Sequence, residues 1–178
     1  MKKFNKALVL LLLLLPLIFV FGCGKSDAAD GSEAMDAAVN GDTPTIVVDQ
    51  VKASQGEKSV KVSVSVKNNP GIIGMTLCVS YDETVLKMTN AENGEALSML
   101  DFTAPGKLQS NYTFLWDGVD LPEDDIQDGT VLTMTFKVSA DARAGKYPII
   151  VSYSEGDIVN EDMDSVAFDV TNGAVTVS

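Results

Sequence analysis

The chain has 178 residues, 46% of them hydrophobic, with 25 acidic and 13 basic side chains, no histidine and a net charge of −12. This length suits one ordinary domain. The lack of histidine removes the most common general base, the usual catalytic triad and most zinc sites, and no nucleophile elbow or phosphate-binding glycine loop is present. The negative charge argues against nucleic acid as a partner, because it would repel phosphate.

Residues 1–22 have the pattern of a secretory signal. Lys2, Lys3 and Lys6 precede an apolar run at 7–21, which is shorter than the ~20 residues that a membrane-spanning helix needs. Removal of this segment leaves 10 basic and 25 acidic residues, a net charge of −15. Such a charge suits an extracellular module that stays dispersed.

The apolar run ends in Val20-Phe21-Gly22-Cys23, which resembles the lipobox of bacterial lipoproteins. The resemblance implies cleavage before Cys23, a diacylglycerol on its thiol, and anchoring at the outer face of the cell membrane. The alternative is that Cys23 follows an ordinary signal or an uncleaved anchor. Residues 23–43 are mainly alanine, aspartate, serine and glycine, and we expect a flexible tether there because so few large apolar side chains cannot offset the entropy of ordering.

Residues 44–178 are predicted to form one all-β domain. Valines at 60, 62, 64 and 66 alternate with lysine and serine, a turn cluster follows at 68–71, and the period of two resumes from 73 to 81. This alternation is typical of half-buried strands. Strands are predicted at 46–49, 60–66, 72–81, 85–89, 112–117, 131–138, 147–154, 166–170 and 174–177. Many short strands with turn residues between them favour a two-sheet antiparallel sandwich.

Particular residues carry a family resemblance. The chain has Asn69-Pro70-Gly71-Ile72, then Ser80-Tyr81-Asp82, then Asp128-Gly129-Thr130 before the strand at 132–138, and Ala144-Gly145 before the strand at 147–154. In this order the segments resemble the cohesin family, whose members bind dockerin modules on bacterial surfaces. The resemblance implies a nine-stranded jelly-roll sandwich.

The resemblance also implies a partner-binding face. Dockerins dock on the flat face of one cohesin sheet, and strand alternation assigns the outward residues of the three equivalent strands here. The candidates are Gly74, Thr76, Thr113, Leu115, Asp117, Ile150, Ser152 and Ser154. Leu115 matches an apolar contact of well-studied cohesins, whereas Gly74 and Thr76 stand where those cohesins carry asparagine and aspartate, so partner specificity is expected to differ. The alternative is that Leu115 is one scattered apolar residue of the surface.

The implied function is a surface-anchored, non-catalytic module that binds a dockerin-bearing secreted protein, such as a glycoside hydrolase, in polysaccharide degradation. We expect no cofactor on this chain, and we expect calcium on the dockerin partner. A carbohydrate-binding module, or a structural or adhesion domain without a dockerin partner, is the alternative.

Three features have competing interpretations. Carboxylates at 123–128 and 155–164 are predicted to be solvated turn residues, with a calcium site or a catalytic acid pair as alternatives. Trp116 alternates inward and is expected in the core, although a lone tryptophan can also form a sugar platform. Cys78 alternates outward and is expected to be an ordinary small side chain, because no adjacent cation would activate its thiol.

Overall fold

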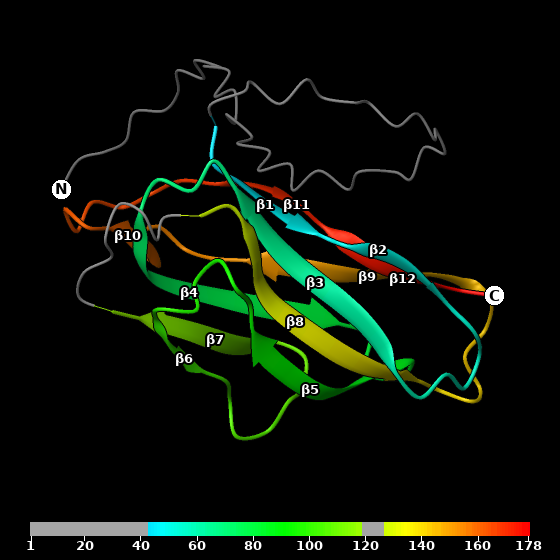
Figure 1. Ribbon diagram of the computed structural model, residues 1–178. Coiled ribbons are helices and arrows are strands. Elements are labelled where there is room, and N and C mark those ends of the chain that lie inside the picture. Colours follow the sequence, from blue (N-terminus) through cyan, green and yellow to red (C-terminus); the bar gives the residue numbers. More distant parts are fainter. Residues whose placement is uncertain (1–42, 119–126) are drawn as a thin grey trace, which may run out of the picture. The chain divides into compact units, whose positions relative to one another are not determined.

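The computed structural model describes residues 43–118 and 127–178, and its ribbon is drawn in Figure 1. Twelve strands are β1 Thr45–Val48, β2 Gln50–Ala53, β3 Val60–Lys67, β4 Ile72–Tyr81, β5 Leu86–Asn93, β6 Asp101–Thr103, β7 Tyr112–Asp117, β8 Gly129–Val138, β9 Gly145–Ser152, β10 Ile158–Asn160, β11 Asp169–Thr171 and β12 Gly173–Val177. No helix occurs in these two ranges. The predictions for residues 1–42 and for Glu123, Asp124 and Asp125 lie outside the described residues.

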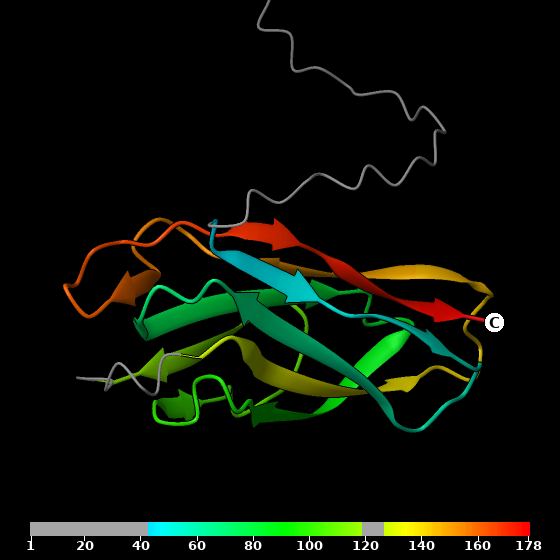
Figure 2. The same cartoon turned by 45° about the horizontal axis from the view of Figure 1, so that its top comes forward.

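The strands form two layers, which Figures 1 and 2 show face to face. One sheet has the order β11-β1-β3-β8-β5, and the other has the order β2-β12-β9-β4-β7-β6, with β10 also paired to β4. The predicted all-β sandwich is confirmed. Joining β1 with β2, β9 with β10 and β11 with β12 as interrupted strands gives nine strands, the number that the resemblance implies. The nine predicted ranges differ from these, since 166–170 and 174–177 fall in one interrupted strand and β6 was not predicted.

Two of the interrupted strands pass from one sheet to the other at a single polar residue. Asp49 separates β1 from β2, and its carboxylate accepts a hydrogen bond from the backbone N of Ser63 at 3.1 Å. Asn172 separates β11 from β12, and its side chain accepts from the backbone N of Val151 at 2.9 Å. These side chains pair backbone groups where the sheet ladder is interrupted. The strand pairs that meet at these crossings, β1 with β11 and β2 with β12, are parallel, and the remaining pairs among the described strands are antiparallel.

The crossing requires a glycine at position 173. A Cβ on Gly173 would lie 2.1 Å from the carbonyl oxygen of Asp49. Such a contact cannot be accommodated without moving the backbone of the neighbouring crossing. The two changes of sheet are therefore packed directly against each other.

The predicted turn at 68–71 connects the two layers, because β3 belongs to one sheet and β4 to the other. Asn68 and Gly71 have positive φ angles of 53° and 83°. The side-chain oxygen of Asn69 accepts from the backbone N of Gly71 and of Ile72, both at 3.1 Å. Asn69 also bonds to the segment before β8, through its backbone N to Asp128 and its side-chain N to the carbonyl of Gln127.

The core lies between the inward faces of the two sheets. The four valines of β3 and the residues Met75, Leu77 and Val79 of β4 are all at most 4% exposed. Each such side chain stabilises the fold by roughly 1.5–3 kcal/mol when it is fully buried. Aromatic rings also pack against one another there: Tyr81 meets Phe136 edge-on at 5.0 Å between ring centroids. Phe102 lies at 6.3 Å from Phe114 and 5.1 Å from Trp116.

Three strands were not predicted from the sequence. β2, β6 and β10 are four, three and three residues long, too short to display a period of two. The predicted strand 147–154 ends earlier, at Ser152, and continues after a turn as β10. Within the described residues, no helix is long and apolar enough to cross a membrane.

Candidate functional site

The outward side of β9, β4 and β7 forms one continuous face, which we call the β4 face. The inward residues of these strands are buried, so the alternate residues are turned outward. Thr76 lies opposite Leu115 and Gly74 lies opposite Asp117. Cys78 lies between Thr113 on β7 and Ser152 on β9, and Ser80 lies opposite Ile150. Seven of the eight predicted partner-binding residues therefore share this face.

Ser154 is the predicted residue that lies outside this ladder. It follows the end of β9 by two residues, and its backbone N donates to the carboxylate of Asp157 at 2.6 Å. The carbonyl of Asp157 in turn accepts from the backbone N of Thr76 at 2.7 Å. The turn therefore continues the pairing of β4 between β9 and β10, and it carries Ser154 into a loop.

Two aliphatic side chains stand exposed on the β4 face. Leu115 is 41% exposed and Ile150 is 44% exposed. Leu115 on β7 lies opposite Thr76 of β4, and Ile150 on β9 lies opposite Ser80 of β4. The two side chains are thus four residues apart along the strand direction and two strands apart across the sheet. At ~3.3 Å per residue and ~4.8 Å per strand, the diagonal between them is ~16 Å. The half-buried Cys78 lies midway between them. An apolar pair with small polar residues between them is the composition expected at the centre of a protein interface.

At one end of the β4 face, β10 places a side chain beside Gly74. Val159 is paired with Gly74, and both residues are turned outward. A Cβ on Gly74 would lie 3.0 Å from Cγ2 of Val159. The valine therefore occupies the space beside position 74, where the resemblance would place an asparagine side chain. The sequence alone did not indicate this contact because β10 was not predicted.

The β4 face is extended on its other side by β6. Asp101 lies directly opposite Asp117, and Thr103 lies directly opposite Leu115. Both aspartates are exposed. These residues were also missed in the sequence, since β6 is only three residues long and follows a turn.

Trp116 does not belong to any exposed surface. Its side chain is 0% exposed, and its indole N donates to the side-chain oxygen of Asn93 at 2.7 Å. The predicted core location is confirmed. A sugar platform requires an aromatic face open to solvent, which this residue does not provide.

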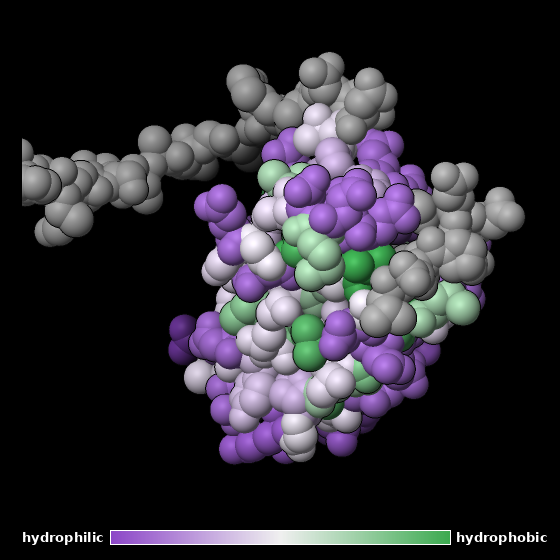
Figure 3. Space-filling model, turned by 90° about the vertical axis from the view of Figure 1, so that its left-hand side faces the viewer, coloured by the Kyte–Doolittle hydropathy of each residue, from purple (hydrophilic) through white to green (hydrophobic). Residues whose placement is uncertain are grey.

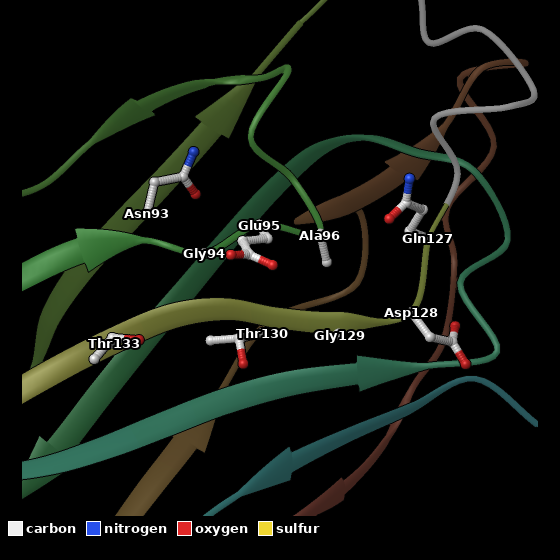
Figure 4. Close-up of a pocket in the computed structure, with 9 residues that line it drawn as sticks. All are labelled: Asn93, Gly94, Glu95, Ala96, Gln127, Asp128, Gly129, Thr130 and Thr133. Carbon is white, nitrogen blue, oxygen red and sulfur yellow. The ribbon is translucent and has the colours of Figure 1, made fainter.

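A polar hollow lies apart from the β4 face, between the segments 93–96 and 127–133 (Figure 4). Its lining includes the carboxylates of Glu95 and Asp128 and no aromatic residue. Asp128 is already bound to the backbone N of Asn69 at 2.9 Å. Among the described residues, no group of three or more histidine, cysteine, aspartate or glutamate side chains could hold a metal ion.

The family model that describes the cohesin domain matches residues 44–177 of this chain. The chain belongs to the cohesin family. No curated protein matches it.

Solved cohesins share the fold of this cohesin. The seventh ScaB type I cohesin from Pseudobacteroides cellulosolvens has 22% sequence identity and a TM-score of 0.65, covering 76% of this chain and 92% of that chain. The OlpA cohesin from Clostridium thermocellum, in complex with the dockerin Doc918, has 22% identity and a TM-score of 0.61, covering 76% and 99%. A non-cellulosomal cohesin from the archaeon Archaeoglobus fulgidus has 21% identity and a TM-score of 0.60, covering 76% and 91%.

The centre of the β4 face in this cohesin is uncharged. Thr76, Cys78, Thr113 and Ser152 offer hydroxyl and thiol groups, and the aspartates Asp117 and Asp101 lie at one end. A partner would therefore meet hydroxyl groups at the centre and charged side chains only towards the ends of this face. An uncharged centre between two exposed aliphatic side chains suits recognition of another macromolecule.

Proposed function

We propose that this cohesin binds a dockerin-bearing protein on its β4 face. The observation that carries the proposal is the row of outward residues across β9, β4 and β7, with Leu115 and Ile150 as apolar anchors. The family membership supports it. The OlpA and OlpC cohesins of Clostridium thermocellum, which have the same fold, were solved in complex with dockerins.

Binding on this face requires no catalytic turnover. The apolar anchors lose contact with water on docking, at roughly 25 cal/mol per Å² of apolar surface. Thr76, Thr113 and Ser152 each carry a hydroxyl that can donate and accept a hydrogen bond, which determines the orientation of the partner. The chain itself needs no cofactor in this proposal, and calcium is expected on the dockerin.

The proposal includes the cellular setting. The basic and apolar segment at 1–22 and Cys23 support export and lipid anchoring, so that the domain would face outward from the cell membrane on its tether. The dockerin would then bring a secreted enzyme, such as a glycoside hydrolase, to the cell surface for polysaccharide degradation.

The test uses matched substitutions on the two sheets. Thr76→Glu and Leu115→Glu each place a negative charge on the β4 face. The control Thr135→Glu places the same charge on the outer side of the other sheet, on β8. Thr135 is half-buried, as Thr76 is. Calorimetric titration with calcium-loaded dockerin modules encoded in the same genome should show binding for the natural chain and for Thr135→Glu. Both β4-face variants should lose at least about tenfold in affinity, equivalent to ~1.4 kcal/mol.

The proposal would be abandoned if none of these dockerins bound at micromolar concentrations, or if both β4-face variants bound as tightly as Thr135→Glu. A chelator should abolish binding in each case, since the calcium belongs to the partner.

A structural or adhesion module without a dockerin partner is the second candidate. It is favoured by Gly74 and Thr76, which carry neither the amide nor the carboxylate expected from the resemblance, and by the fold it shares with a non-cellulosomal archaeal cohesin. The same titration separates the two candidates, because this second one requires that no dockerin bind.

A further inference from the structure

The charges around the β4 face are divided between its two ends. Asp101 and Asp117 lie directly opposite each other beyond Leu115. Like charges in directly opposed positions of an antiparallel pair destabilise it. A positive group placed over this pair would remove the repulsion.

The same end carries further negative charge. β10 is paired with the first residues of β4, and the turns on either side of it contain five acidic residues and no lysine or arginine. These are Glu155, Asp157, Glu161, Asp162 and Asp164. Figure 3 views this end of the sandwich, and hydrophilic side chains gather along much of its visible rim.

At the opposite end, basic side chains lie beyond Ile150 on β9 and β2, and two acids, Asp82 and Glu83, follow the end of β4. Lys146 precedes Ile150 by four residues on β9, so the two side chains lie on the same side of the sheet. Thr176 is paired with Lys146 on one side and with Lys52 on the other, which places both lysines at this end of the outer surface. The loop before β9 adds Arg143 and one acid, Asp141.

The apolar anchors lie between these two charged ends. Their diagonal of ~16 Å corresponds to about 11 residues of α-helix, at a rise of ~1.5 Å per residue, which is three turns. Two apolar residues at this spacing lie on one side of a helix. The β4 face therefore matches a helix with apolar residues at positions i and i+11, lying from Leu115 to Ile150.

We propose that this cohesin binds a helix of its partner across both anchors, and that the charge division allows one orientation, with basic residues beyond the Leu115 end and acidic residues beyond the Ile150 end. The inference rests on the proposed function and specifies the chemistry of the partner. A helix laid in the reverse direction would keep both apolar contacts but would bring like charges together at both ends. Such juxtaposition is unfavourable across protein interfaces and lowers the association rate.

The experiment selects partners without assuming their charge. A dockerin scaffold is displayed with its docking helix randomised at the anchor positions and at the positions flanking each anchor. Selection is carried out on the natural chain, on a charge-swapped chain (Asp101→Lys, Asp117→Lys, Lys52→Glu, Lys146→Glu), and on a control chain with Lys61→Glu and Lys137→Glu on the other sheet. Because four reversals could impair folding, the neutral variant Asp101→Asn, Asp117→Asn is selected in parallel, and the thermal unfolding of each chain is recorded.

Helices selected on the natural and control chains should carry lysine or arginine beyond the Leu115 end and acid beyond the Ile150 end. The charge-swapped chain should select the reverse pattern, and the neutral variant should lose only the basic preference. A helix selected on the natural chain should bind the charge-swapped chain at least about tenfold more weakly. Equal binding, or selected helices without any charge bias, would overturn the inference and leave the proposed function standing. If no helix is selected on the natural chain, both fail.

Discussion

The indole N of Trp116 donates a hydrogen bond of 2.7 Å to the side-chain oxygen of Asn93, and this bond joins β7 of one sheet to β5 of the other. The side-chain N of Asn93 bonds in turn to the carbonyl of Leu97 at 3.2 Å. Because side chains alternate along a strand, burial of Trp116 turns Leu115 and Asp117 outward. A contact inside the core thus determines which residues of β7 belong to the β4 face.

We expect Asn93→Ala to destabilise the fold by about 1–3 kcal/mol, because it leaves the buried indole N without a partner. Trp116 is the only tryptophan, so its fluorescence during urea unfolding reports the change directly. In a Trp116→Phe background, followed by circular dichroism, Asn93→Ala should cost less, since no indole remains to be satisfied. An equal cost in both backgrounds would show that the hydrogen bond is not the cause.

The contact between Gly74 and Val159 gives a second prediction. A Cβ at position 74 would lie 3.0 Å from Cγ2 of Val159, so Gly74→Ala should destabilise the fold by about 1 kcal/mol through overpacking. In a Val159→Ala background the same change should cost less, because the crowding atom is absent. Chemical denaturation of the four proteins measures the coupling, and additive effects would contradict the packing argument.

The sequence predicted the long strands well, for a physical reason. β3, β4 and β7 each alternate between a buried and an exposed side, so the period of two appears within the strand itself. The same alternation predicted that Thr76 and Leu115 point outward. β6 has only the residues Asp-Phe-Thr, and its inclusion in the sheet depends on pairing with β7, which no local pattern reveals.

The sequence also could not predict which residues are neighbours across strands, because no local pattern reveals strand pairing. The proximity of Val159 to Gly74 and of Asp101 to Asp117 follows from strand register, which is determined by contacts distant in the chain. The turn at Ser154 was hidden because Val151, Tyr153 and the serines around them continue the alternating pattern past the end of β9.

The turn after β4 predicts a dependence on acid pH. The carboxylate of Asp82 accepts from the hydroxyl of Thr84 at 2.6 Å and from its backbone N at 2.9 Å. These bonds favour the charged form and hold the pKa of Asp82 below its usual value. A lowered pKa in the folded state stabilises the fold above the pKa of the unfolded chain, and this contribution is lost as the pH falls through the folded pKa.

Thr84→Val removes the hydroxyl bond and should raise the pKa of Asp82 towards its ordinary value. Titration of the carboxyl carbon resonance by NMR measures the shift. Thr89→Val serves as a control, because the hydroxyl of Thr89 bonds to the carbonyl of Thr135 elsewhere in the sheet. An unchanged pKa of Asp82 in Thr84→Val would disprove the role of the hydroxyl.

The turn between the two layers depends on one side chain. We expect Asn69→Ala to destabilise the fold by about 1–3 kcal/mol, since its amide bonds to Gly71, Ile72 and Gln127 would be lost. Hydrogen exchange should accelerate at the backbone N of Gly71 and Ile72 relative to the centre of β4. Asn68→Ala tests a different property, because Asn68 has a φ of 53° and alanine is strained there; it should leave the Gly71 and Ile72 amides better protected than Asn69→Ala does.

The thiol of Cys78 can report occupancy of the β4 face. It is half-buried, and it lies midway between Leu115 and Ile150. A partner seated across both anchors should shield this thiol, so alkylation of residues 24–178, which lack Cys23, should slow at least about tenfold when a dockerin is bound at saturation. Leu115→Glu should show the unprotected rate with the same dockerin, because it weakens docking without altering the thiol. Full reactivity of Cys78 in a saturated complex would place the partner on another surface of the sandwich.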